Sequence, residues 1–212
     1  MAKKEKMQPK AFPNIIFDLG GVLLNLDIAR TIRAFSTLTG KDFTQWYSQN
    51  KQKAFFTDFE TGKITPDEFR QILRQELQAP LSDAEIDHCW NAMLLDLPIE
   101  RLQLLEQLKS QKRIFLLSNT NAIHKAAFEK IIQTQHGIAS LSHFFEQDYY
   151  SHLLGMCKPH PEVFHYILET HGLEAKETLF IDDSIQHVEG AKKAGLQAIH
   201  LTGNTDIVRI FN

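Results

Sequence analysis

Three short apolar runs of the chain are each followed by acidic or other polar residues, and a lysine stands between the second run and the third. The run ends and the lysine segment are Phe17-Asp18-Leu19-Gly20-Gly21, Leu117-Ser118-Asn119-Thr120, Gly155-Met156-Cys157-Lys158-Pro159-His160-Pro161 and Phe180-Ile181-Asp182-Asp183-Ser184. If the runs are parallel strands of one sheet, their ends meet at one edge of that sheet. We therefore expect three carboxylates, a hydroxyl and an ammonium group to meet there.

The three carboxylates are suited to a divalent cation. Asp182 and Asp183 are adjacent, so in an extended backbone their side chains point to opposite sides. At most one of them can share a centre with Asp18, and the other would support it from behind. Two carboxylates that converge in a half-buried pocket repel each other unless a cation lies between them. Oxygen ligands with open positions for water and phosphate favour Mg²⁺.

The remaining polar groups are suited to an anion. Ser118 and the backbone amides of Asn119 and Thr120 precede a predicted helix, where an anion is stabilised. Lys158 would place a positive charge on a phosphate and hold a nearby carboxylate ionised. Taken singly, Asp-Asp and Ser-Asn after strands are common turn and cap residues. Taken as an ordered set at successive strand ends, they indicate a phosphoryl-transfer centre.

The elements that must position these groups are indicated by hydrophobic pattern. Four apolar runs without alternation predict strands covered on both faces, as in a parallel sheet: Asn14–Gly20, Arg113–Asn119, Thr178–Ser184 and Gln197–Thr202. Helical stripes separate these runs, and one of them follows Pro161, a residue typical of a first helical turn. The alternation predicts an α/β layered fold.

One segment is too long for a simple crossover between strands. Roughly 100 residues separate Asp18 from Ser118, where some tens of residues would be enough. The surplus contains two capping boxes, Thr65-Pro66-Asp67-Glu68 and Ser82-Asp83-Ala84-Glu85. We therefore predict an all-helical insertion at residues 26–98, a core formed by residues 13–25 and 99–212, and a flexible N-terminal tail at residues 1–12.

Composition excludes several classes of protein. The 212 residues include only two cysteines, Cys89 and Cys157, which rules out a disulfide framework. No run of apolar residues is long enough for a membrane span, and the first ten residues lack the apolar core of a signal peptide. Those ten residues hold four Lys and one Glu, so the other 202 residues carry a net charge of −6, which is unsuited to nucleic acid. We expect a cytoplasmic protein without nucleic-acid or membrane partners; its oligomeric state is not predicted.

The motifs FDLGGVL, LSNT, KPHPEVF and FIDDS resemble those of the haloacid dehalogenase (HAD) superfamily, from about Asn14 to Leu201. This resemblance implies a Rossmann-like parallel core, with the helical insertion in the place of the α-helical cap. The cap segment FETGKITPDEF (Phe59–Phe69) and the segment SNTNAIH (Ser118–His124) are similar to the subgroup that contains bacterial sugar-phosphate phosphatases.

The resemblance also implies roles for individual residues. Asp18 would attack phosphorus and form an aspartyl-phosphate, and Ser118, Asn119 and Lys158 would bind the phosphoryl group. Mg²⁺ would be bound by Asp18, the backbone carbonyl of Gly20 and Asp183, with Asp182 behind them in the second shell. His187 stands where many relatives have an acidic residue or Asn, which is a departure in the outer shell of the metal.

The main departure is Gly20, because the usual pattern has a second aspartate at this position. That aspartate protonates the leaving group and later activates water, and such help is worth about 10²- to 10⁴-fold in rate. One candidate substitute is Asp27, whose alternative role is that of a cap hinge. His124, which otherwise belongs to a helix surface, is another, and a substrate hydroxyl is a third.

Three functions follow as hypotheses. The favoured one is a Mg²⁺-dependent phosphatase that hydrolyses a small phosphate monoester, with a sugar phosphate as the preferred substrate class. The second is a phosphate-binding or regulatory protein that has lost turnover with the second aspartate. The third is dehalogenation of 2-haloacids, against which the Asp182-Asp183 pair argues because that reaction needs no metal. Histidine and cysteine spacing favours no zinc site. Phe55, Phe56 and Phe59 are expected mainly in the cap core.

Overall fold

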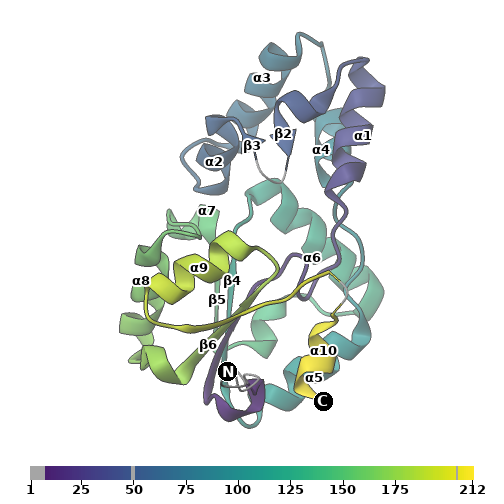
Figure 1. Cartoon of the computed structure of the whole chain (residues 1–212). Helices are drawn as coiled ribbons and strands as arrows, with labels where there is room; N and C mark the ends of the chain where they lie inside the picture. Colours follow the sequence, from purple (N-terminus) through teal and green to yellow (C-terminus); the bar gives the residue numbers. More distant parts are fainter. Residues whose placement is uncertain (1–7, 49–50, 204) are drawn as a thin grey trace, which may run out of the picture.

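The chain folds into two lobes that meet at one edge of a central sheet (Figure 1). This computed structural model describes residues 8–48, 51–203 and 205–212. The predicted tail therefore lies outside the described residues at positions 1–7. Residues 8–12 differ from a free tail, because Pro9–Ala11 form a 3₁₀ turn with Pro9 buried, and Lys112 Nζ donates to the carbonyls of Lys10 and Phe12. No described helix combines the length and apolarity of a bilayer span.

The larger lobe contains a five-stranded sheet in which every pairing is parallel, as predicted. The strand order is β5 (Gln147–Tyr150), β4 (Arg113–Ser118), β1 (Asn14–Phe17), β6 (Thr178–Asp182) and β7 (Gln197–His200). The edge strand β5 was not among the four predicted strands. Its sequence, QDYY, has no apolar run, because it lies at the edge of the sheet and exposes Gln147.

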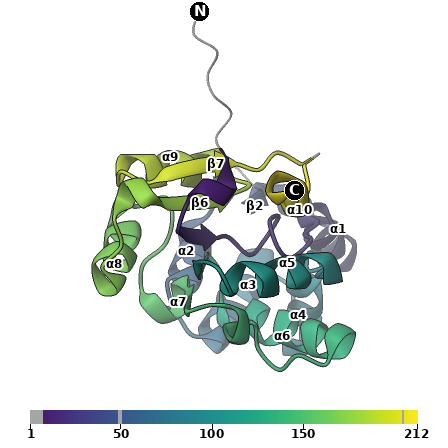
Figure 2. The ribbon, with the colours of Figure 1, turned by 90° about the horizontal axis from the view of Figure 1, so that it is seen from below.

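Alternating side chains of the strands bury two separate hydrophobic clusters. Ile15 and Phe17 join the cluster beneath α5 (Ile99–Lys109), α6 (Ala122–His136) and α10 (Ile207–Phe211), while Ile16 joins the cluster beneath α8 (Pro161–His171) and α9 (Ile185–Lys193). Figure 2 shows α8 and α9 on one side of the sheet and α5 and α6 on the other. The strands are buried on both faces, which explains their uninterrupted apolar sequence.

The smaller lobe contains α1 (Ile28–Thr39), α2 (Ala54–Glu60), α3 (Pro66–Leu77) and α4 (Asp83–Asn91). Both predicted capping boxes are present, at the starts of α3 and α4. The prediction of an all-helical insertion was wrong in one respect. A two-stranded hairpin, β2 (Tyr47–Ser48) and β3 (Lys51–Gln52), precedes α2. We call this lobe the cap. It has its own cluster of buried side chains, which includes Phe56, Phe59 and Trp90.

Two linker segments join the cap to the sheet and run beside each other. Leu26 and Leu94 form an antiparallel bridge, Asn25 N donates to Asp96 O (2.9 Å), and Leu95 N donates to Asn25 O (3.0 Å). The cap is thus attached through a short two-stranded ribbon.

The cap also contacts the sheet lobe at α7 (Ser151–Leu154). Gly62, in the turn after α2, has φ +70°, and a Cβ atom there would lie 2.2 Å from the backbone oxygen of His152. Only glycine permits this approach. Ser151 Oγ in turn exchanges hydrogen bonds with Thr120 N (2.9 Å) and O (3.0 Å), so the contact reaches the end of β4.

Candidate active site

A fully buried lysine joins two of the strand ends. Lys158 Nζ lies 2.6 Å from Asp18 Oδ1, directly after β1, and 2.7 Å from Asp182 Oδ2, at the end of β6. The Lys158 side chain is 0% exposed, and its ammonium lies 5.4 Å from the centre of the Phe180 ring. Burial lowers the pKa of Lys158, but the two carboxylates outweigh this and raise it, so the ammonium keeps its charge.

Asp182 is held inside the protein by three donors. Besides Lys158, the backbone N–H of Ser184 donates to Oδ1 (2.7 Å) and His187 Nδ1 lies 3.0 Å from both carboxylate oxygens. Burial alone would raise the pKa of Asp182, but Lys158 and His187 hold it well below its usual range. Asp182 therefore stays ionised, and its oxygens are taken up by protein donors. His187, the outer-shell departure, acts here as a partner of Asp182.

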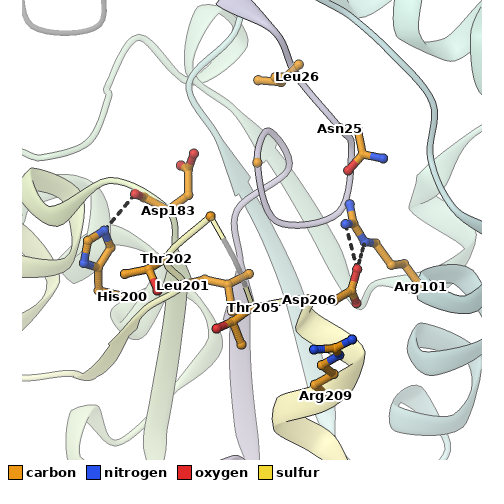
Figure 3. Close-up of a pocket in the computed structure, with 12 residues that line it drawn as sticks. Asn25, Leu26, Arg101, Asp183, His200, Leu201, Thr202, Thr205, Asp206 and Arg209 are labelled. Carbon is orange, nitrogen blue, oxygen red and sulfur yellow. Dashed lines mark hydrogen bonds and ion pairs between the residues drawn. The ribbon is translucent and has the colours of Figure 1, made fainter.

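Asp183 lines two cavities at the sheet edge, whereas Asp182 is fully buried. Ligand oxygens of Asp18, Asp182 and Asp183 all lie within 4.8 Å of one another. Gly21, with φ +72°, makes room for Asp183, since a Cβ atom at Gly21 would lie 2.1 Å from Asp183 Oδ2. Figure 3 shows a polar cavity of about 620 Å³ that Asp183 lines. There, His200 Nε2 donates to the backbone carbonyl of Asp183 (2.9 Å).

The charges of this group do not balance without a further cation. One ammonium faces three carboxylates, and burial, followed by the neighbouring carboxylates, raises the pKa of Asp18 to about 8 despite Lys158. Burial and Asp182 likewise raise the pKa of Asp183. In a site that binds a divalent cation, two neighbouring carboxyl groups are expected to resist ionisation until the cation is bound. The donor set therefore fits Mg²⁺.

The segment that contains Lys158 is attached to the end of β4. Asn119 Nδ2 donates to Lys158 O (2.9 Å), and Lys158 N donates to Asn119 Oδ1 (3.0 Å). The Asn119 side chain thus positions the backbone of Lys158. This role differs from the predicted one, which was contact with the substrate. Ser118 is 3% exposed at the end of β4 and lines a cavity of about 120 Å³ next to Asn119 and Gly20.

Above Gly20, the space that an acidic side chain would need is occupied by Leu26. A Cβ atom at Gly20 would lie 2.5 Å from Leu26 Cδ1. Leu26 belongs to the first linker and is 36% exposed. The position of the absent second aspartate is therefore covered by an apolar side chain of the first linker.

A cavity of about 480 Å³ opens between the sheet edge and the cap. The sheet lobe contributes Asp18, Lys158 and Asp183, and the cap contributes residues that include Tyr47, Thr57 and Glu60. Glu60 was not among the predicted site residues. Glu60 belongs to the segment FETGKITPDEF. Its position at this cavity depends on how the cap docks on the sheet lobe, which local sequence does not show.

The two predicted substitute acids lie in different surroundings. Asp27 caps α1 by accepting from Ala29 N (3.0 Å), pairs with Arg30 and Arg33, and is not among the residues lining the cavities next to Asp18. His124 lies inside the protein, not on a helix surface. Its ring stacks on Trp90 and its Nδ1 lies 3.0 Å from Asn91 Oδ1. Burial lowers the pKa of His124 to about 3, so its ring is uncharged near neutral pH and is a poor general acid.

Comparison with curated proteins finds relatives along most of the chain. The chain is 28% identical over 193 residues to a D-ribitol-5-phosphate phosphatase of Bacteroides thetaiotaomicron, covering 91% of this chain and 93% of that protein. It is 26% identical over 198 residues to the sesquiterpene phosphatase astK of Aspergillus oryzae, covering 90% of each.

Solved structures and a family model agree with these relatives. A HAD family enzyme of Bacteroides thetaiotaomicron, solved as an aspartate-to-alanine mutant with magnesium and inorganic phosphate, superposes with a TM-score of 0.89 at 34% identity. The match covers 95% of this chain and 99% of that one. A family model described as haloacid dehalogenase-like hydrolase matches residues 12–195. The chain therefore belongs to the haloacid dehalogenase-like hydrolases.

Proposed function

We propose that this protein is a Mg²⁺-dependent phosphatase that hydrolyses a small phosphate monoester, with Asp18 as the nucleophile. The observation that carries the proposal is the arrangement of Asp18, Lys158 and Asp183 in a cavity between the sheet edge and the cap. A carboxylate, a buried ammonium and a site suited to a divalent cation are the groups that phosphoryl transfer needs.

In this proposal each group has one task. Asp18 attacks phosphorus and forms the aspartyl-phosphate, which water then hydrolyses. Lys158 and Ser118 hold the phosphoryl oxygens, and Asn119 fixes the backbone of Lys158. Asp18, Asp183 and the carbonyl of Gly20 would hold Mg²⁺, with Asp182 behind them. The bound cation would supply positive charge that keeps Asp18 ionised and neutralises the phosphoryl group.

We infer a sugar or polyol phosphate as the substrate class. The support is the similarity to the D-ribitol-5-phosphate phosphatase over nearly the full length of both chains. Cap residues around the cavity present polar groups, among them the Thr57 hydroxyl and the Glu60 carboxyl. A substrate rich in hydroxyls would find hydrogen-bond partners there.

The test is a hydrolysis screen over polyol and sugar phosphates, including ribitol 5-phosphate, and 4-nitrophenyl phosphate, with Mg²⁺ or with a chelator. We expect turnover that requires Mg²⁺ and is abolished in Asp18→Asn. Phosphate binding without turnover would instead indicate the regulatory role, which the phosphatase relatives do not favour. Halide release from a 2-haloacid in the presence of chelator would indicate a dehalogenase.

A further inference from the structure

Glu60 of the cap lies where a group above Asp18 could reach a substrate. It lines both the cavity of about 480 Å³ that contains Asp18 and Lys158 and the adjoining cavity of about 120 Å³ that contains Ser118. Gly20 lines both cavities as well. Glu60 therefore lines the same two cavities as Gly20, the position that lacks its acidic side chain.

The docking of the cap holds Glu60 in this place. Glu60 is the last residue of α2, and the two residues that follow form a tightly bonded turn. Thr61 Oγ1 donates to Thr57 O (2.8 Å), Lys63 N donates to Asp58 O (2.8 Å), and Gly62 packs on the α7 backbone. Because α7 is bonded to the end of β4, the contact that closes the cap also sets the position of Glu60 relative to the active site.

The surroundings of Glu60 tune its proton affinity. Burial raises the pKa of Glu60 to about 7, and the Lys158 charge lowers it only in part. Its neighbours across the cavities hold their own protonation states near neutral pH. Burial and Glu60 raise the pKa of both Tyr47 and Cys157, Lys158 keeps its charge, and His124 is neutral. Such a carboxyl can both give and take a proton at physiological pH.

We propose that Glu60 is the general acid and base of this enzyme and replaces the aspartate that is absent at Gly20. The inference rests on the proposed phosphatase function. As Asp18 bonds to phosphorus, the bond from phosphorus to the ester oxygen breaks, and protonated Glu60 gives its proton to that oxygen. The alcohol leaves and Glu60 is ionised. Glu60 then takes a proton from water, whose oxygen bonds to phosphorus while the bond to Asp18 breaks. Inorganic phosphate, free Asp18 and protonated Glu60 result.

The test compares two esters in Glu60→Gln, a variant that keeps the shape of the side chain. A polyol phosphate has a leaving group that needs a proton, so its rate should fall by about 10²- to 10⁴-fold. The leaving group of 4-nitrophenyl phosphate needs none, so its first turnover should stay within a few-fold of the wild-type rate. The second step still lacks its base. We therefore expect a burst of nitrophenolate equal to the enzyme concentration, with aspartyl-phosphate accumulating in acid-quenched protein.

Other results separate this role from mere positioning. Equal rate losses on both esters without a burst, or unchanged rates on both, would overturn the proposal. The matched control is Asp58→Asn, which removes a carboxylate from the same helix. The Asp58 carboxylate pairs with Lys63 (3.5 Å), and its removal should produce neither effect. Failure of the proposed function itself is distinguishable, because then the wild type would show no turnover dependent on Asp18.

Discussion

Replacing Glu60 by Gln should stabilise the folded protein at alkaline pH and leave its stability unchanged in acid. The pKa of Glu60 rises from 4.5 to about 7 on folding, because burial disfavours the ionised form. Between these two values the native state keeps a proton that the unfolded chain has lost. Stability from this group is therefore complete below about pH 4.5 and is lost as the pH rises to about 7. The loss is about 3 kcal/mol at most, at about 1.4 kcal/mol for each unit of pKa.

Gln carries no charge in either state and escapes this loss. We expect the free energies of unfolding of the two proteins to be similar near about pH 4.5, and Glu60→Gln to be more stable by about 1–3 kcal/mol near about pH 8. Urea denaturation of the metal-free proteins at several pH values measures the difference. Asp58→Asn, a substitution in the same helix, is the matched control. A gap between wild type and Glu60→Gln that does not grow with pH would refute the reasoning.

Two further perturbations test the site and its surroundings. Gly21→Ala should lower the free energy of unfolding by about 1–2 kcal/mol, because Gly21 has a left-handed backbone conformation. It should also weaken Mg²⁺ binding, measured by calorimetry, because the new Cβ would lie 2.1 Å from Asp183 Oδ2. Gly40→Ala is the matched control, since φ there is +68° with open space around it, and it should leave Mg²⁺ affinity unchanged. For His124, whose pKa falls from 6.5 to about 3 on folding, stability is complete above about pH 6.5 and is lost as the pH falls toward 3. His124→Gln should reduce that acid slope by up to about 1.4 kcal/mol for each pH unit, and equal slopes in the two proteins would contradict the buried neutral state.

Local signals in the sequence were enough for much of the fold. Thr65 and Ser82 begin helices because their side chains and a glutamate three residues later satisfy the first N–H groups, which needs no tertiary contact. The four apolar runs became strands because a parallel sheet with helices on both faces buries both sides of each strand. The strand β5 lacks this pattern at its exposed edge, and only its pairing with β4 defines it.

The site was predictable to the extent that it follows from topology. Parallel strands bring Asp18 and Asp182 to one edge, and the lysine between the later strands meets them there. Glu60 was out of reach of that reasoning, since its helix belongs to another lobe and the sequence does not show which face of the cap turns inward. His124 was misplaced for a similar reason, because the contact of α6 with Trp90 of the cap buries it.

The packing of Leu26 over Gly20 bears on how this site can evolve. An aspartate introduced at position 20 would find its Cβ 2.5 Å from a Leu26 methyl carbon, so Leu26 must first turn away or become smaller. Leu26 Cδ1 is the end of a flexible side chain that is 36% exposed, so rotation of Leu26 can relieve this contact. Substitutions at positions 20 and 26 are therefore expected to be coupled, because an acid at position 20 needs Leu26 to rotate and a smaller residue at position 26 removes that need.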